Sequence, residues 1–417
     1  MRKLVYVVIT LLGSVLFPLA AMAEDPPSER VGELVFGMSA AFSGASRGLG
    51  IEYYRGASAW FNHVNAGGGV NGHTLRILPL DDGYDPIPTI RNTIRLVRDE
   101  KVFALFSYVG TPTTTRILPL LKHFEQERMF LLFPFSGAQP LRDPPYGDRV
   151  FNLRASYFQE TRGLVQHFTS LGRRRIGVFY QADAYGRNGW DGVRRALAEE
   201  GLEIVSEAAY QRGALFSREY DREVEVLAAG RPDAIVTVGS YAATAGFIRD
   251  AREQGLDIPI ATISFSDSDN MLRLLRAVGR SRGKVYTNDL VCAQVVPSYE
   301  DVTLPVVRLY REVMDQHAEM PPDNVLREPY SPHRYSFVSL EGFLNAVLLT
   351  NMVEHLGPQP SRERIPDALY ALNGVDLGLG CPLRYSVQKN QGLDAVYYVT
   401  VREGRFVPLE DWSGWAK

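Results

Sequence analysis

The sequence is poor in the residues that metal sites and disulfide frameworks require. Its 417 residues include two cysteines, Cys292 and Cys381, and seven histidines. It contains no C-x-x-C pair and no H-E-x-x-H arrangement, so we expect no zinc site, no other metal and no cofactor. Two cysteines so far apart in sequence form either one disulfide or two separate thiols, and their spacing does not decide between these.

The sequence also lacks the patterns of hydrolases and of nucleic-acid-binding proteins. It has no G-x-S-x-G elbow and no evident Ser/His/Asp set, which argues against an enzyme. The formal net charge is -3, and residues 173–175 are the only dense basic run. This run follows a predicted helix, where cations are favourable at the C-terminus. We therefore expect no nucleic-acid partner.

A long hydrophobic run occurs only at the start of the chain. Arg2 and Lys3 precede an apolar run over residues 4–19, and Ala21-Met22-Ala23 follows it. A positive segment, an apolar segment and a small-residue cleavage site are typical of a secretory signal peptide. The run is interrupted by Pro18 and is short for a spanning helix. We expect residues 1–23 to be removed and the mature chain to be exported without a membrane anchor.

A glycine-rich stretch matches a nucleotide-binding pattern in the wrong context. Gly67, Gly69 and Gly72 satisfy G-x-G-x-x-G, which in dinucleotide sites follows a strand and opens a helix. Here a helical pattern over residues 53–64 precedes the glycines, and a strand pattern over residues 74–80 follows them. The order predicts a helix end and a turn, where glycine adopts positive φ without strain.

Predicted strands alternate with predicted helices along most of the chain. The strands are residues 34–41, 75–80, 102–106, 129–133, 176–180, 203–208, 234–238 and 259–263, with an extended stretch at 285–296. Helices are expected between them and at 304–314 and 339–353, with β-hairpins from Val375 onward. This alternation predicts an α/β fold of parallel sheets flanked by helices. The pattern restarts near residue 151, which predicts two such lobes.

The chain is expected to cross between the lobes more than once and so to form a hinge. We assign residues 31–153 and 292–386 to the first lobe, and residues 154–291 and 387–417 to the second. A ligand is expected in the crevice at the carboxyl ends of both sheets. The adjacent Asp81 and Asp82 point to opposite faces of a strand, so we expect a turn and capping role for them instead of catalysis.

Several segments, in this order, resemble the type I periplasmic solute-binding proteins of ABC transporters, the leucine/isoleucine/valine-binding protein family. They are residues 43–44, 67–72, 81–86, 110–112, 134–138 with 141–142, 151–157, 183–186 and 239–241. The resemblance implies a periplasmic, monomeric receptor whose lobes close on one small solute. Such a receptor delivers the solute to an ABC permease at the inner membrane. The alternative is a periplasmic sensor that passes the same closure to a signalling partner.

In the first lobe, two turns are candidate ligand contacts. Gly110 and Thr111 lie at a predicted helix start, where free N–H groups and the Thr111 hydroxyl suit a carboxylate. The alternative is that Thr111 only caps its own helix. Ser136, Gly137 and Ala138 follow the next strand in the same way, and Gly137 would allow a close backbone approach.

In the second lobe, the candidates are aromatic. Tyr157, Tyr185 and Tyr241 each fall at a predicted loop or helix start, where a ring can cover an apolar ligand body. Core packing is the alternative for each of them. Phe265 lies in the stretch where amino-acid-binding relatives carry an acid for the ligand ammonium, and the nearest acid here is Asp267. The expected solute is therefore a branched-chain or other amino acid, or a related carboxylate or amide.

Three arginines are candidate charge partners. Arg47 lies in the first loop, close to Leu49, an apolar residue at a position where the resembling proteins can carry a ligand-facing aromatic side chain. Arg142 and Arg154 flank the predicted crossing near residue 151 and are equally compatible with bracing the hinge. The sequence leaves these alternatives open.

Overall fold

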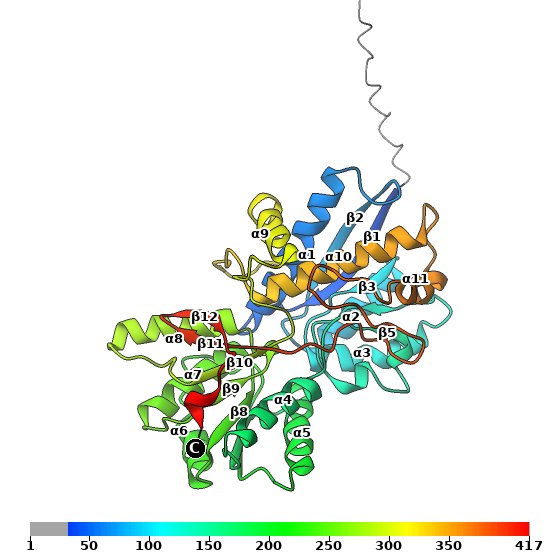
Figure 1. The fold of residues 1–417 in the computed structure, drawn as a ribbon. Coiled ribbons are helices and arrows are strands. Elements are labelled where there is room, and N and C mark those ends of the chain that lie inside the picture. Colours follow the sequence, from blue (N-terminus) through cyan, green and yellow to red (C-terminus); the bar gives the residue numbers. More distant parts are fainter. Residues whose placement is uncertain (1–31, 417) are drawn as a thin grey trace, which may run out of the picture.

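The computed structural model describes residues 32–416, so the predicted signal peptide lies outside the described residues. Two sheets form the centres of two lobes, as Figure 1 shows in blue and cyan for the first and mainly in green for the second, whose last two strands are red. The first sheet has the order β2 (His73–Asp81), β1 (Gly32–Ala40), β3 (Ala104–Phe106), β4 (Leu131–Leu132) and β5 (Val150–Phe151). All of its neighbouring strands are parallel.

The second sheet is parallel except at one edge. Its order is β12 (Arg405–Pro408), β11 (Tyr397–Arg402), β10 (Leu290–Gln294), β9 (Ile260–Thr262), β8 (Ala234–Val238), β6 (Ile176–Gln181) and β7 (Ser206–Tyr210). The hairpin of β11 and β12 pairs antiparallel with β10, so the last strands of the described chain complete the second sheet. The predicted α/β fold with two lobes is confirmed, with one antiparallel hairpin added.

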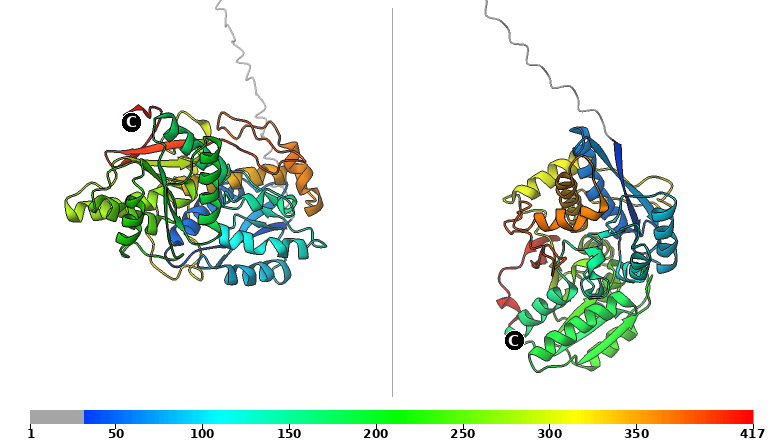
Figure 2. Two further views of the ribbon diagram at one scale, coloured as in Figure 1. Left: turned by 90° about the horizontal axis from the view of Figure 1, so that it is seen from below. Right: turned by 90° about the vertical axis from the view of Figure 1, so that its right-hand side faces the viewer.

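Helices cover the faces of both sheets (Figure 2). The first lobe contains α1 (Arg47–Ala66), α2 (Pro86–Arg98), α3 (Thr111–His123), α9 (Pro305–His317), α10 (Phe337–Leu356) and α11 (Ile365–Ala371). The second contains α4 (Tyr157–Ser170), α5 (Ala184–Glu199), α6 (Asp221–Ala229), α7 (Tyr241–Glu253) and α8 (Ser268–Arg282). Short 3₁₀ turns are η1 (Gln139–Leu141), η2 (Gly147–Arg149), η3 (Ser264–Ser266), η4 (Arg362–Arg364) and η5 (Ser413–Trp415). Among residues 32–416, no helix combines the length and apolarity needed to cross a bilayer.

The glycine-rich stretch ends a helix, as predicted. Helix α1 stops at Ala66, and Gly68, Gly69 and Gly72 then take positive φ values of 103°, 83° and 81°. The next element is β2 and not a helix, so the geometry that a pyrophosphate needs is missing at this turn.

The two aspartates after β2 build a turn, also as predicted. The Asp81 carboxylate accepts hydrogen bonds from the Ser43 hydroxyl at 2.6 Å and from Phe42 N at 2.9 Å. The Asp82 carboxylate accepts one from the Ser39 hydroxyl at 2.7 Å. Burial raises the pKa of Asp82 to about 7. These contacts fix the loop that carries Tyr84.

Three crossings join the lobes, over residues 152–156, 295–304 and 372–396. The first and third lie side by side, because Asn152 pairs with Gln391 in a parallel bridge. Gly392 N donates to Asn152 O, and Leu393 N donates to Leu153 O, both at 2.8 Å. The last residues of β10, 292–294, lie in the second sheet, although the predicted lobe boundaries place them in the first lobe. The exact lobe boundaries stay a prediction.

Both cysteines are free thiols. Cys292 is buried in β10, and Cys381 is half-buried in the third crossing. Of the two possibilities that the sequence left open, the structure has the separate thiols.

Helices α1 and α10 cross at very short range and hold the first lobe together (Figure 1). A Cβ atom on Gly342 would lie 2.2 Å from Tyr53 O, and one on Gly56 would lie 1.8 Å from Ser339 O. Because both contacts are with backbone, neither can relax by a side-chain rotation. The two helices can approach this closely only with glycine at the crossing.

Replacing Gly342 by alanine should therefore lower the free energy of unfolding, by about 1–3 kcal/mol for an overpacked core. Urea denaturation measures this change. Gly414→Ala is the control, because nothing lies within 4 Å of a Cβ there. Equal stability of the two variants would show that the helices separate at no cost.

Candidate functional site

The predicted site residues converge where strands of both sheets end. Gly110 and Thr111 follow β3, and Ser136 follows β4, in the first lobe. In the second lobe, Tyr185 begins the helix after β6 and Phe265 lies in η3 after β9. Because parallel strands end at the same edge, these turns meet in the crevice between the lobes.

Three hydroxyl groups form a buried cluster across this crevice. The Thr111 hydroxyl is hydrogen-bonded to the Ser136 hydroxyl at 2.8 Å and to the Tyr157 hydroxyl at 3.2 Å. Thr111 and Ser136 belong to the first lobe, and Tyr157 begins α4 of the second. Burial raises the pKa of Tyr157, so its phenol stays protonated and can donate. The Thr111 hydroxyl is thus hydrogen-bonded to a residue of the opposite lobe.

The start of α3 next to this cluster is uncapped. Within the described residues, no side chain caps this terminus, and Gly110 at the N-cap position has φ of 106°. The alternative in which Thr111 caps its own helix is therefore wrong. A helix start without a cap leaves backbone N–H groups available to an anion.

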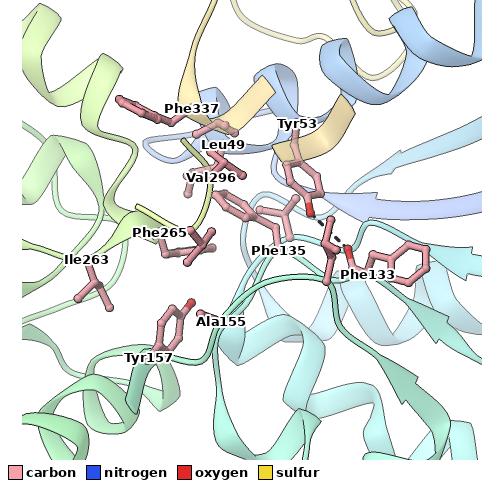
Figure 3. Close-up of a cluster of buried hydrophobic side chains, with 14 of the residues drawn as sticks. Leu49, Tyr53, Phe133, Phe135, Ala155, Tyr157, Ile263, Phe265, Val296 and Phe337 are labelled. Carbon is pink, nitrogen blue, oxygen red and sulfur yellow. Dashed lines mark hydrogen bonds between the residues drawn. The ribbon is translucent and has the colours of Figure 1, made fainter. Parts of the chain in front are cut away.

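Phe265 of the second lobe lies at the centre of an aromatic cluster (Figure 3). Its ring centroid is 4.7 Å from that of Tyr185 and 6.5 Å from that of Tyr157 in its own lobe. Across the crevice it lies 5.1 Å from Phe135 and 6.0 Å from Tyr84. All five side chains are buried. The lobes are thus closed on each other through aromatic rings.

Tyr84 is a further candidate site residue that the sequence did not single out. Its hydroxyl is buried and has no hydrogen-bond partner within residues 32–416. A Cβ on Gly110 would lie 2.3 Å from the Tyr84 ring, so this glycine makes room for the tyrosine. Tyr84 lies in the segment at residues 81–86, which was interpreted as a turn and as part of the family resemblance. An orphaned buried hydroxyl is an available ligand contact.

Two predicted contacts of the β4 turn have packing roles. A Cβ on Gly137 would lie 2.4 Å from the Tyr157 ring, so the close approach at Gly137 is to this tyrosine. Tyr157 N also donates to Gly137 O at 2.8 Å. Ala138 is buried, and its carbonyl oxygen accepts from Arg142 at 3.0 Å. Both residues therefore shape the crevice through their neighbours.

The other two tyrosines differ in position. The Tyr185 ring is fully buried against Phe265, and its hydroxyl lies 3.5 Å from Gly239 O, a weak contact. The Tyr241 hydroxyl instead accepts from Gly48 N of the first lobe at 3.4 Å. Tyr241 therefore lies at the seam between the lobes, close to Asp267.

A buried guanidinium lies beneath the aromatic cluster. Arg154, 1% exposed, lies 3.2 Å from Glu160 of α4 and 3.3 Å from Glu341 of α10, and it also donates to the Ser264 hydroxyl. Burial lowers the pKa of Arg154, but the two carboxylates outweigh this effect and raise it, so the charge is retained. Burial raises the pKa of Glu341 to about 7. The network joins both lobes and the first crossing.

The remaining two arginines act elsewhere. Arg142 donates to Gln391 at 2.6 Å and to Arg154 O at 3.0 Å, which ties the first and third crossings together. Burial lowers the pKa of Arg142 to about 9. Of the two alternatives for Arg142, the structure has hinge bracing. Arg47 forms a partly exposed ion pair with Glu328 at 3.3 Å.

Asp267, the first acid after β9, is buried at the seam. Asp267 has φ of 57° and caps α8, where Asn270 donates to its carboxylate from the side chain at 2.6 Å and from the backbone at 3.1 Å. Within the described residues it forms no ion pair with a cationic side chain. Burial raises the pKa of Asp267 to about 8. A buried carboxyl group without a cation is a candidate partner for a ligand ammonium.

Asn270 also links the two lobes. Its side chain donates to the Tyr330 hydroxyl at 2.9 Å, and that hydroxyl donates to Glu52 of α1 at 3.1 Å. His333 N donates to the same carboxylate at 2.8 Å. Residues 318–336 of the first lobe thus reach over the start of α8 in the second.

Two α/β lobes, closed over a buried crevice at the carboxyl ends of their strands, define a ligand-binding protein of the periplasmic type. Residues 33–405 match the sequence model of the family described as periplasmic binding protein. The chain belongs to this family, whose members are ligand-binding proteins of ABC transporters and not enzymes.

Individual relatives agree with this assignment. A possible leucine/isoleucine/valine-binding protein from Rhodopirellula baltica SH 1 is 30% identical with a TM-score of 0.77, covering 93% of this chain and 98% of that one. A branched chain amino acid ABC transporter structure from Thermus thermophilus, with bound valine, shares the fold at 18% identity and a TM-score of 0.77, covering 91% of this chain and 96% of that one. An amino acid binding protein of Pseudomonas aeruginosa is 24% identical over 229 residues. That match covers 54% of this chain and only 58% of the relative's length.

The buried Asp267 should make stability depend on pH. Its folded-state pKa of about 8 lies above the usual 3.8, so between these values the folded protein holds a proton that the unfolded chain has released. The free energy of unfolding then falls as pH rises, by up to about 1.4 kcal/mol per pH unit for one group. Asp267→Asn removes this contribution and should lose less stability between pH 5 and pH 8. Urea denaturation at several pH values measures this, and parallel profiles for the two proteins would contradict the assignment.

Proposed function

We propose that this protein is a periplasmic receptor that closes its lobes on one small solute with a carboxylate or amide group and delivers it to an ABC permease. The observation that carries the proposal is the uncapped start of α3, which lies beside the hydroxyls of Thr111, Ser136 and Tyr157. Backbone N–H groups and hydroxyls together suit a carboxylate. The expected signal peptide at residues 1–23 agrees with export.

The rest of the crevice suits an apolar ligand body. When the lobes part, Phe265 withdraws from Phe135 and Tyr84, and the solute enters between these rings. Tyr185 then covers the apolar body from the second lobe, and the unpaired Tyr84 hydroxyl is available for a polar contact. Burial of apolar area and the carboxylate contact both favour closure, so binding shifts the population to the closed form.

Asp267 determines which class of carboxylate fits. If the ligand carries an ammonium group, the Asp267 carboxyl group releases its proton and pairs with it. If the ligand lacks one, Asp267 stays protonated as a helix cap, and a simple acid or amide binds. The two classes are a branched-chain or other α-amino acid on one side and an aliphatic or aromatic acid on the other.

A thermal-melt screen of the chain without residues 1–23 tests the proposal and the ligand class together. A ligand at 1,000 times its dissociation constant stabilises the folded protein by about 4 kcal/mol, which raises the melting temperature by several degrees. Hits are expected among amino acids, simple acids and amides. Hits confined to amino acids that are lost in Asp267→Asn assign the ammonium contact. No hit in any of these classes would contradict the proposal.

Removing the Thr111 hydroxyl should weaken the ligand found in this screen. Thr111→Val should cost about 1–3 kcal/mol of binding free energy, since a charge-assisted hydrogen bond is lost in a buried site. Thr111→Ser, which keeps the hydroxyl, is the matched control. Isothermal titration calorimetry measures both variants. If valine and serine give equal affinity at equal stability, the hydroxyl does not contact the ligand.

A further inference from the structure

A second cavity lies at the edge of the molecule, away from the aromatic cluster. It has a volume of about 660 Å³ and is lined by α8 and the turn of the β11–β12 hairpin from the second lobe. Arg311 of α9 and residues 333–335 line it from the first lobe. Both lobes therefore contribute walls, and the cavity is complete only in the closed arrangement.

Four arginines of the second lobe face this cavity. Arg273, Arg276 and Arg280 follow each other on α8 at spacings of three and four residues, which places them on one helix face. Arg405 comes from the hairpin turn. Within residues 32–416, none of the four forms an ion pair with a carboxylate. Arg273 and Arg276 donate only to backbone oxygens, those of Ser331 and Gly404.

The acidic groups at this cavity are too few to balance these charges, although Arg273 lies close enough to Asp269 to lower its pKa against the larger effect of burial. Asp269 is buried, and its carboxylate already accepts from the Tyr299 hydroxyl at 2.7 Å and from Phe337 N at 2.9 Å. Glu300 is paired with Arg311 of the first lobe at 3.2 Å. One carboxyl group, that of Asp269, therefore faces four arginines without an ion pair, and the cavity carries an excess of positive charge.

Ordinary helix electrostatics do not account for the cluster. Cations are favourable in the last turn of a helix, which covers Arg280 but neither Arg273 nor Arg276. The hairpin turn also packs directly on the cluster, because a Cβ on Gly404 would lie 3.0 Å from Arg276 Nε. Like charges gathered around one cavity raise the free energy of the folded protein unless an anion accompanies them.

We propose that this cavity is a binding site for a small multivalent oxyanion. A guanidinium group presents a planar set of N–H donors that matches phosphate or carboxylate oxygens in pairs. Arg276 and Arg405 lie on different elements of the cavity wall, and Arg273 and Arg280 flank Arg276 along α8. The site is separate from the solute crevice and does not depend on which solute binds there.

Inorganic pyrophosphate is the probe for this site. It should raise the melting temperature of the wild-type protein at an ionic strength matched with sodium chloride, and calorimetry should detect its binding. The double variant Arg276→Ala/Arg405→Ala should bind pyrophosphate about tenfold or more weakly, because two charge-assisted contacts are lost. The melting temperature without pyrophosphate verifies that the variant is folded.

Arg222→Ala is the matched control. Arg222 is an exposed arginine on α6 that also has no ion pair among the described residues, and it lies outside this cavity. This variant should bind pyrophosphate as the wild-type protein does. No pyrophosphate effect on the wild-type protein, or equal effects in all three proteins, would overturn the proposal and leave α8 with a solvated basic face.

Discussion

The buried charge of Arg154 is the interaction on which the closed structure depends. Its guanidinium joins the first crossing to Glu160 in the second lobe and Glu341 in the first. An ion taken out of water is costly unless every partner is in place, so this group tolerates few arrangements of the lobes. Separation of α10 from α4 would leave buried charges unpaired. The network therefore restricts how the hinge can move.

The same group links the hinge to the candidate binding site. Arg154 donates to the Ser264 hydroxyl, and Phe265 is the next residue along η3. The Arg154 network thus fixes the backbone next to Phe265, and so the position of the Phe265 ring against Phe135. Because the carboxyl ends of the strands converge there, a few short turns deliver polar groups to an otherwise apolar crevice. The residues that hold the lobes closed therefore adjoin the residues that we propose bind the solute.

Patterns local in sequence were predictable, and contacts between distant segments were not. The glycine turn after α1 and the turn at Asp81 and Asp82 followed from spacing and residue type alone, and the structure confirms both, although the residue that caps α2 is Asp85. The two-lobe α/β fold followed from the alternation of elements. The β11–β12 hairpin was expected as β-hairpins in the tail, with residues 387–417 assigned to the second lobe, but nothing local specifies that it pairs antiparallel with β10.

The candidate site was harder to predict for a physical reason. Glu160 and Glu341 are far apart in sequence, and only the packed fold brings both to Arg154. Tyr84 was missed because it stands in a turn segment whose sequence already has a sufficient structural explanation. Gly137 was predicted to allow a ligand to approach the backbone closely, and in the structure the group next to it is the Tyr157 ring. These contacts between residues distant in sequence form only when the chain packs, so no local pattern in the sequence predicts them.

The crossing of α1 and α10 has a consequence for how the chain reaches its native state. The two helices are almost 300 residues apart in sequence, and the whole second sheet up to β10 lies between them. Loop-closure entropy opposes such distant pairings, and domains with many of them fold slowly. The first lobe cannot complete its core until α10 has docked, whereas β6 to β10 form from one continuous segment. The continuous segment should therefore fold ahead of the first lobe, and the incomplete first lobe is the stage most exposed to aggregation.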